Sequence, residues 1–151
     1  MKVAIASDHA GFQYKNILLK IIRDNGYELI DLGAYSDETG DDYPDHAEHI
    51  AKAIINAEAE KGILICGSGV GVSVAANKFK SIRAGVCHDT YSAHQCVEHD
   101  DVNVLCIGQR VIGIELAREI VLTFLAATFS HEPRHQHRLD KIRNIENRTM
   151  R

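Results

Sequence analysis

Short apolar segments alternate five times with stretches of helical periodicity, and this alternation limits the fold more than any other feature of the chain. The apolar segments are rich in β-branched residues and predict strands at residues 2–6, 28–32, 62–66, 83–87 and 103–107. The intervening stretches have apolar residues at helical spacing and predict helices at residues 12–25, 44–60, 70–79, 91–98 and 113–127. Strands that alternate with helices form a parallel sheet covered on both faces. We therefore expect an α/β fold, a Rossmann-like three-layer α/β/α sandwich with a five-stranded parallel sheet.

The length and composition fit one domain. The chain has 151 residues, of which 45% are hydrophobic, enough to bury one core. We expect residues 1–151 to form a single domain that ends in a polar C-terminal helix at residues 134–148. Its few apolar residues, Leu139, Ile142 and Ile145, would pack against the body or a partner subunit. The longest irregular segment, at residues 34–45, is rich in aspartate and glycine.

Charge and cysteine usage exclude several classes of protein. The net charge of −4 argues against nucleic-acid binding, which needs a basic surface. The N-terminus becomes polar too early for a secretory signal, and the apolar stretch 114–129 is interrupted by Glu115, Arg118 and Glu119, so no membrane span is expected. Four cysteines without a CxxC pair are typical of a reducing compartment. These features predict a cytoplasmic protein.

In a parallel α/β sheet, ligands bind at the carboxyl ends of the strands, so the residues that follow each strand are the candidates for chemistry. Asp8 and His9 follow the first strand. Asp8 has two interpretations that the sequence leaves open: it caps the next helix, or it acts in a site.

The third predicted strand runs into a glycine-rich turn, Cys66-Gly67-Ser68-Gly69-Val70-Gly71. Alternate glycines allow successive N–H groups to point at one position, where they and the following helix N-terminus would hold an anion. The turn lacks the lysine and the spacing of nucleotide-binding loops. The same amides would stabilise a thiolate at Cys66, so this cysteine is either a base or nucleophile, or a core residue. We interpret Cys87 and Cys106 as core residues.

Four further polar residues are weaker candidates for catalysis or phosphate binding. His99, near the end of a predicted helix, is either a partner of the helix dipole or a catalytic group. Arg110 follows the fifth strand, at the expected ligand edge. Arg134 and Arg138 are four residues apart on one helix face, where they either grip a phosphate or face solvent. The clustered histidines lack the spacing of a metal site, and no metal is expected.

Several segments together resemble the type B ribose-5-phosphate isomerases. They are SDHAGF, DYPDHA, ILICGSGVGVSVAANKF, EHDDVNVLCIGQRVIG and RHQHR, and the similarity runs over nearly the whole chain. The resemblance implies an α/β/α sandwich that needs no cofactor or metal. It also implies a homodimer, or a tetramer, whose sites are built from two subunits.

The resemblance implies a role for each candidate residue in isomerising a phosphorylated sugar. Cys66 would move a proton between C2 and C1, and the amides of Gly67, Ser68, Gly69, Val70 and Gly71 would hold the enediolate. The Ser68 hydroxyl would help to move protons. His99 would open the sugar ring, Asp8 would place a hydroxyl and Tyr43 would line the pocket. The phosphate would be bound by His9, Arg110, Arg134 and Arg138.

Two positions depart from patterns in that family, and two alternatives stay open. Val72 stands where some members have a glutamate base, which leaves only the cysteine. Asp100 stands where asparagine is expected in many relatives. Its carboxylate would repel an enediolate unless it were protonated or turned towards a sugar hydroxyl, so it bears on the substrate's hydroxyl pattern and not on the reaction class. The alternatives to ribose 5-phosphate and ribulose 5-phosphate are a hexose phosphate such as galactose 6-phosphate or allose 6-phosphate, and a non-catalytic nucleotide-binding module.

Overall fold

The computed structural model describes residues 1–150 and contains one five-stranded sheet. The strands are β1 (Lys2–Ser7), β2 (Glu28–Asp31), β3 (Lys61–Cys66), β4 (Ala84–Val86) and β5 (Val104–Gly108). All neighbouring strands are parallel, in the order β2-β1-β3-β5-β4. The α/β prediction is confirmed, and every predicted strand is present to within one residue at each end.

The helices follow the predicted segments but differ from them at several ends. They are α1 (Phe12–Asp24), α2 (Tyr43–Ile55), α3 (Val70–Ala76), α4 (Thr90–Asp100), α5 (Ile114–Ala126) and α6 (Pro133–Thr149), with a short 3-10 turn, η1 (His9–Gly11), before α1. The predicted end of α2 at residue 60 is wrong, since this helix ends at Ile55, and so is the predicted end of α3 at residue 79. The Asn77 side chain exchanges hydrogen bonds with the backbone of Ala84, which ties the chain to β4 and ends the helix.

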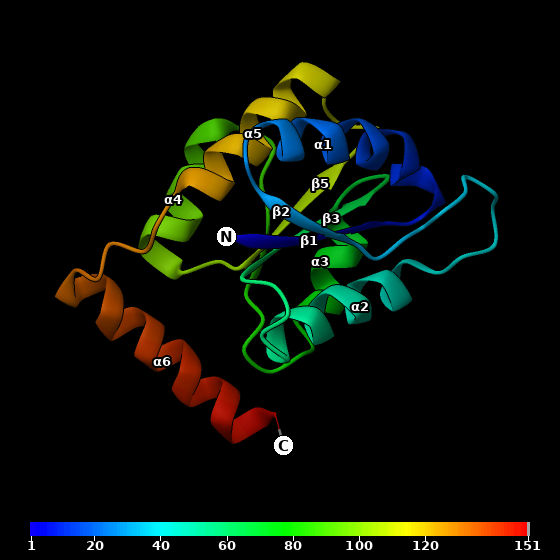
Figure 1. Ribbon diagram of the computed structural model, residues 1–151. Coiled ribbons are helices and arrows are strands. Elements are labelled where there is room, and N and C mark those ends of the chain that lie inside the picture. Colours follow the sequence, from blue (N-terminus) through cyan, green and yellow to red (C-terminus); the bar gives the residue numbers. More distant parts are fainter. Residues whose placement is uncertain (151) are drawn as a thin grey trace.

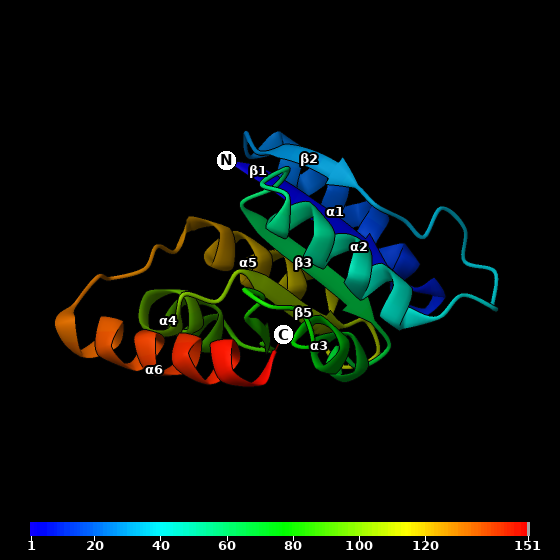
Figure 2. The same cartoon turned by 90° about the horizontal axis from the view of Figure 1, so that it is seen from below.

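Two layers of helices cover the sheet, as Figures 1 and 2 show. Side chains alternate along each strand, so Ile63 and Ile65 of β3 face α1, α4 and α5, whereas Leu64 and Cys66 face α2 and α3. Both layers are closely packed and apolar. The result is the three-layer sandwich expected from the sequence.

Helix α6 lies outside these layers, along α4 (Figure 2). Only His135 and Leu139 are buried in it, whereas Ile142 and Ile145 are about half exposed. Figure 1 places α6 on the side of the molecule where β1 begins. Its apolar residues beyond Leu139 are available for a partner, and contact with another subunit stays a prediction.

No helix within residues 1–150 combines the length and the apolar character required to cross a bilayer.

The strand order determines where a ligand can bind. From β1 the chain crosses to β2 on one side, and then returns to β3 on the other side of β1. Such a reversal opens a crevice at the carboxyl ends of the two strands. The loops after β1 and β3 therefore meet, and they carry Asp8, His9 and the glycine-rich turn.

Candidate active site

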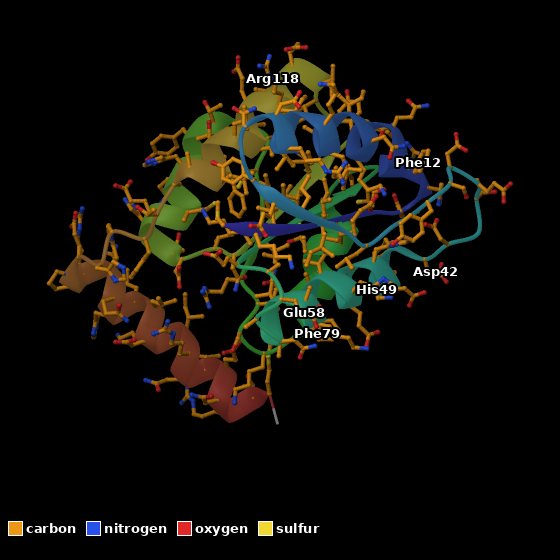
Figure 3. The ribbon with its side chains drawn as sticks, viewed as in Figure 1. Phe12, Asp42, His49, Glu58, Phe79 and Arg118 are labelled. Atoms are coloured by element: carbon orange, nitrogen blue, oxygen red, sulfur yellow. The ribbon has the colours of Figure 1, made fainter. Side chains whose placement is uncertain are left out.

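An open cleft of about 380 Å³ lies at the carboxyl ends of β1 and β3. It is lined by eight of the residues predicted from the sequence: Asp8, His9, Tyr43, Cys66, Gly67, Ser68, Gly71 and Arg110. Figure 3 labels two residues at this end of the molecule, away from α6. Phe12 is the first residue of α1, and Asp42 directly precedes α2. Residues distant in sequence are thus brought together by the reversal in strand order.

Cys66 is the last residue of β3, and its sulfur is held by the turn that follows. The Gly69 N–H donates to Cys66 Sγ over 3.0 Å, a short distance for an acceptor sulfur. Gly69 has φ +80°, a left-handed conformation that glycine adopts without strain and that turns its amide towards Sγ. The cysteine is only 5% exposed, yet it lines the cleft. The sulfur therefore lies at the wall of the cleft with a main-chain donor beside it.

The rest of the glycine-rich turn presents main-chain donors. The Val70 N–H is used within the turn, since it donates to Ser68 Oγ over 3.2 Å. The amides of Ser68 and Gly71 have no protein acceptor within residues 1–150. Helix α3 has only seven residues, three fewer than predicted, so its dipole contributes less than a longer helix would. The free amides, more than the helix, are therefore the donors that this turn offers to a ligand.

Asp8 caps the turn that follows it, one of the two interpretations left open by the sequence, and it also lies where the other interpretation requires it. Its carboxylate accepts the Gly11 N–H over 3.1 Å and so caps η1, while the residue also lines the cleft. It is 7% exposed, and this burial raises the pKa of Asp8 against the lowering effect of the Gly11 hydrogen bond. A buried carboxyl group with a raised pKa in a cleft is typical of a functional site.

Tyr43 and Arg110 each form part of the cleft wall. Tyr43 begins α2, and its ring lies so close to Gly71 that a Cβ at residue 71 would be 2.9 Å from ring carbons. Arg110 lies over Gly67, with its guanidinium Nη1 3.3 Å from the corresponding Cβ position. The Arg110 N–H donates to the Gly67 carbonyl over 3.0 Å, which fixes the loop after β5 against the glycine-rich turn.

A hydrogen-bonded group that the sequence analysis missed lies in the loop between β2 and α2. Asp41 accepts hydrogen bonds from the rings of His9 and His46. Burial works against the charge of Asp41, but the hydrogen bonds from the two histidines lower its pKa. Loop residues have no periodicity that predicts their partners, so only the cluster of acids and histidines in residues 41–49 hinted at it.

Four predicted residues lie elsewhere in the chain: His99, Asp100, Arg134 and Arg138, on α4 and α6. Because α4 returns antiparallel to the strands, its C-terminal end lies at the amino edge of the sheet, opposite the cleft. There the His99 ring stacks on His135 with centroids 4.0 Å apart. A single chain does not bring these residues to Cys66.

The other cysteines and the possible metal ligands add no second centre. Cys106 is fully buried in β5, and this burial raises its pKa. Cys87 is also buried, with its sulfur 3.8 Å from that of Cys96. Both cysteines predicted as core residues are therefore in the core. In the part of the chain that the structure describes, no three His, Cys, Asp or Glu residues are grouped to hold a metal ion.

Comparison with known proteins decides between the classes that this cleft allows. The family model described as Ribose/Galactose Isomerase matches residues 3–142. The chain belongs to the ribose/galactose isomerase family. Members of this family are sugar-phosphate isomerases, so this chain is an isomerase of that class, as the resemblance in its motifs predicted.

Individual relatives cover nearly the whole chain. The ribose-5-phosphate isomerase B of Escherichia coli is 46% identical, over 97% of each chain. The D-erythrulose-4-phosphate isomerase 2 of Mycolicibacterium smegmatis is 41% identical, over 85% of this chain and 86% of its own. The structure of ribose-5-phosphate isomerase B from Mycoplasma genitalium, with bound ribulose-5-phosphate, has a TM-score of 0.92 at 40% identity, covering 98% of this chain and 97% of that chain.

Proposed function

We propose that this isomerase interconverts ribose 5-phosphate and ribulose 5-phosphate, with Cys66 as the general base. One observation carries the proposal: the Cys66 sulfur accepts an amide hydrogen bond at 3.0 Å and lines the same cleft as Asp8, His9 and Arg110. A relative of nearly equal length binds ribulose-5-phosphate. A base beside free main-chain donors is what proton transfer between adjacent sugar carbons requires.

The reaction is a balanced movement of two protons. The Cys66 thiolate takes the proton from C2 of the open-chain aldose, and the electron pair moves to form the C1–C2 double bond of an enediolate. Charge builds on the two oxygens, where the free amides of Ser68 and Gly71 donate hydrogen bonds. Ser68 Oγ assists the proton exchange between these oxygens, and the thiol then returns its proton to C1.

The remaining roles require residues from two copies of the chain. His9 and Arg110 line the cleft and bind the phosphate from the same chain as Cys66. His99, which opens the ring, and Arg134 and Arg138, which complete the phosphate site, lie at the opposite edge of the sheet. A second copy therefore supplies them, together with Asp100, and the working unit is a homodimer or a pair of dimers.

Replacement of the sulfur tests the proposal directly. Cys66→Ala is expected to reduce kcat at least about 10³-fold, because a base that acts in the transition state is removed. A coupled assay with ribose 5-phosphate in the presence of a chelator measures turnover, and thiol alkylation of the wild type should give the same loss. Inorganic phosphate binding and the melting temperature should stay near wild-type values. Cys106→Ala, another cysteine on the same face of the sheet, is the control for loss of a thiol. Undiminished turnover in Cys66→Ala would exclude the role.

Substrate length is the open question within this class. A relative that is 41% identical is a D-erythrulose-4-phosphate isomerase, which makes a four-carbon substrate a second candidate. A comparison of kcat/KM on tetrose, pentose and hexose phosphates, including galactose 6-phosphate and allose 6-phosphate, distinguishes them. A non-catalytic nucleotide module would instead bind adenine nucleotides in calorimetry without any turnover. The cytoplasmic location stays a prediction.

A further inference from the structure

Asp41 connects two histidines from different elements. Its Oδ1 lies 2.5 Å from His9 Nδ1 and accepts the His9 main-chain N–H over 3.1 Å. Its Oδ2 lies 2.7 Å from His46 Nε2. Both oxygens of one loop carboxylate are therefore engaged, one by the second residue after β1 and the other by the first turns of α2.

These contacts fix the orientation of the His9 ring. The backbone and the ring of His9 bind the same oxygen, which limits rotation about the side chain. A ring nitrogen that faces a carboxylate carries the proton, so Nδ1–H donates and the tautomer is set. Nε2 is then left free in the cleft that His9 lines, and it donates to a phosphate oxygen when it also carries a proton, as in the imidazolium form that an anionic ligand favours.

His46 holds the carboxylate from the other side. It is 8% exposed, and its Nδ1 is buried with no hydrogen-bond partner within residues 1–150. Asp41 is therefore the one polar side chain to which this ring is bonded in the described residues. A buried histidine with a single polar contact has an orientation that depends on that contact.

We propose that Asp41 is a positioning residue that aligns His9 for the phosphate of the substrate, and that His46 holds Asp41 in place. The proposal rests on the proposed function, in which His9 contacts the phosphate. A free carboxylate this close would repel a phosphate dianion, but both oxygens of Asp41 already accept hydrogen bonds from the two histidines. The charge of Asp41 therefore acts on the ring of His9 more than on the ligand.

Kinetics separate positioning from simple support of the loop. Asp41→Ala is expected to raise KM for the sugar phosphate about tenfold with kcat within about twofold, because binding is weakened and the reacting carbons are untouched. Asp41→Asn, which keeps one acceptor oxygen, should recover part of the loss. Asp37→Asn removes an exposed carboxylate from the same loop and should leave KM unchanged. In a His9→Ala background, Asp41→Ala should add nothing.

Additive losses in the double variant, or an unchanged KM in Asp41→Ala, would overturn the proposal. So would a fall in kcat alone. His46→Gln is the second variant, for use if Asp41→Ala fails to fold, and it should raise KM less than Asp41→Ala does.

A measurement without turnover keeps this proposal distinct from the proposed function. In ¹⁵N NMR of the imidazoles, His9 should show a proton on Nδ1 in the wild type and a mixture of tautomers in Asp41→Ala. Titration with inorganic phosphate should shift the His9 resonances, about tenfold more weakly in the variant. Phosphate binding without ribose 5-phosphate turnover would overturn the proposed substrate and leave the role of Asp41 standing. A wild-type His9 that phosphate does not perturb would overturn the role of Asp41.

Discussion

Asp8 has a buried carboxyl group that also caps η1, so its charge affects stability as well as function. Burial raises its pKa in the folded state above that in the unfolded chain, so the folded state holds the proton more tightly. The stability contributed by the protonated form is present at low pH and is lost as the pH rises through the folded pKa.

Asp8→Asn should therefore gain stability relative to the wild type as the pH rises. The amide oxygen still accepts the Gly11 N–H, and the side chain has no charge to bury. Urea unfolding from about pH 4 to about pH 7 measures the difference in free energy of unfolding, which should grow and then level off. A difference that is the same at every pH would contradict the prediction. Activity should fall in the same variant, because a hydroxyl-binding carboxylate is lost.

Gly71 allows the Tyr43 ring to form a wall of the cleft. Gly71→Ala places a methyl group 2.9 Å from ring carbons, so the half-exposed ring must move. Alanine is favoured over glycine in a helix by about 1 kcal/mol, which offsets the crowding, so the free energy of unfolding should change by less than about 1 kcal/mol. KM should rise about three- to tenfold. In a Tyr43→Ala background the same change should have no further effect on KM, and a further rise would assign the effect to the turn itself.

The residues whose place was predictable lie at or just after the carboxyl ends of strands. Cys66 ends β3, Asp8 directly follows β1 and Arg110 lies two residues beyond β5, and parallel topology brings such positions to one edge. Asp41 and His46 were not predictable, because the path of the irregular loop decides which side chains they meet. The raised pKa of Asp8 depends on burial, which the sequence pattern does not specify at a loop residue.

At the scale of elements, the direction in which a helix runs relative to the sheet decides where its residues lie, and its exact length matters less. The predicted helices are all present, with ends that side-chain caps such as Asn77 and Asp89 determine. Asp89 accepts the Ser92 N–H and so caps the N-terminus of α4. A helix that follows a parallel strand returns to the amino edge, so a histidine just before β5 lies opposite the cleft. The position of His99 at the amino edge could therefore be deduced from the sequence, provided that the direction of each helix relative to the sheet is taken into account.

Helix α6 carries Arg138 on an exposed surface, and a role in phosphate binding predicts a specific kinetic effect. Arg138→Ala should raise KM about tenfold or more and leave kcat within about twofold, since a charge-assisted hydrogen bond to the phosphate is lost. Arg143→Ala, on another face of the same helix, is the matched control and should leave KM unchanged. Size-exclusion chromatography should show the same oligomer for both variants. An unchanged KM for Arg138→Ala would return this arginine to an exposed, solvated helix face.

At the scale of the molecule, alternation of strands and helices predicted the layers but not the strand order. Several orders satisfy the same alternation, and in this sheet β5 lies between β3 and β4. The position of the cleft follows from the reversal between β1 and β3. The separation of Cys66 from His99 within one chain also follows, because they lie at opposite edges of one sheet.

This separation leads to a prediction for the assembled protein. Cys66→Ala and His99→Asn should each be nearly inactive as pure proteins. A mixed dimer would combine both lesions in one site and leave the other site with an intact Cys66 from one chain and an intact His99 from its partner. Co-refolding the two inactive variants in equal amounts should therefore restore about a quarter of wild-type activity, because half of the dimers are mixed and each has one intact site. Mixing without refolding is the control and should restore activity only as fast as subunits exchange. No recovery after co-refolding, with mixed dimers demonstrated by mass spectrometry, would mean that each site uses residues of one chain only.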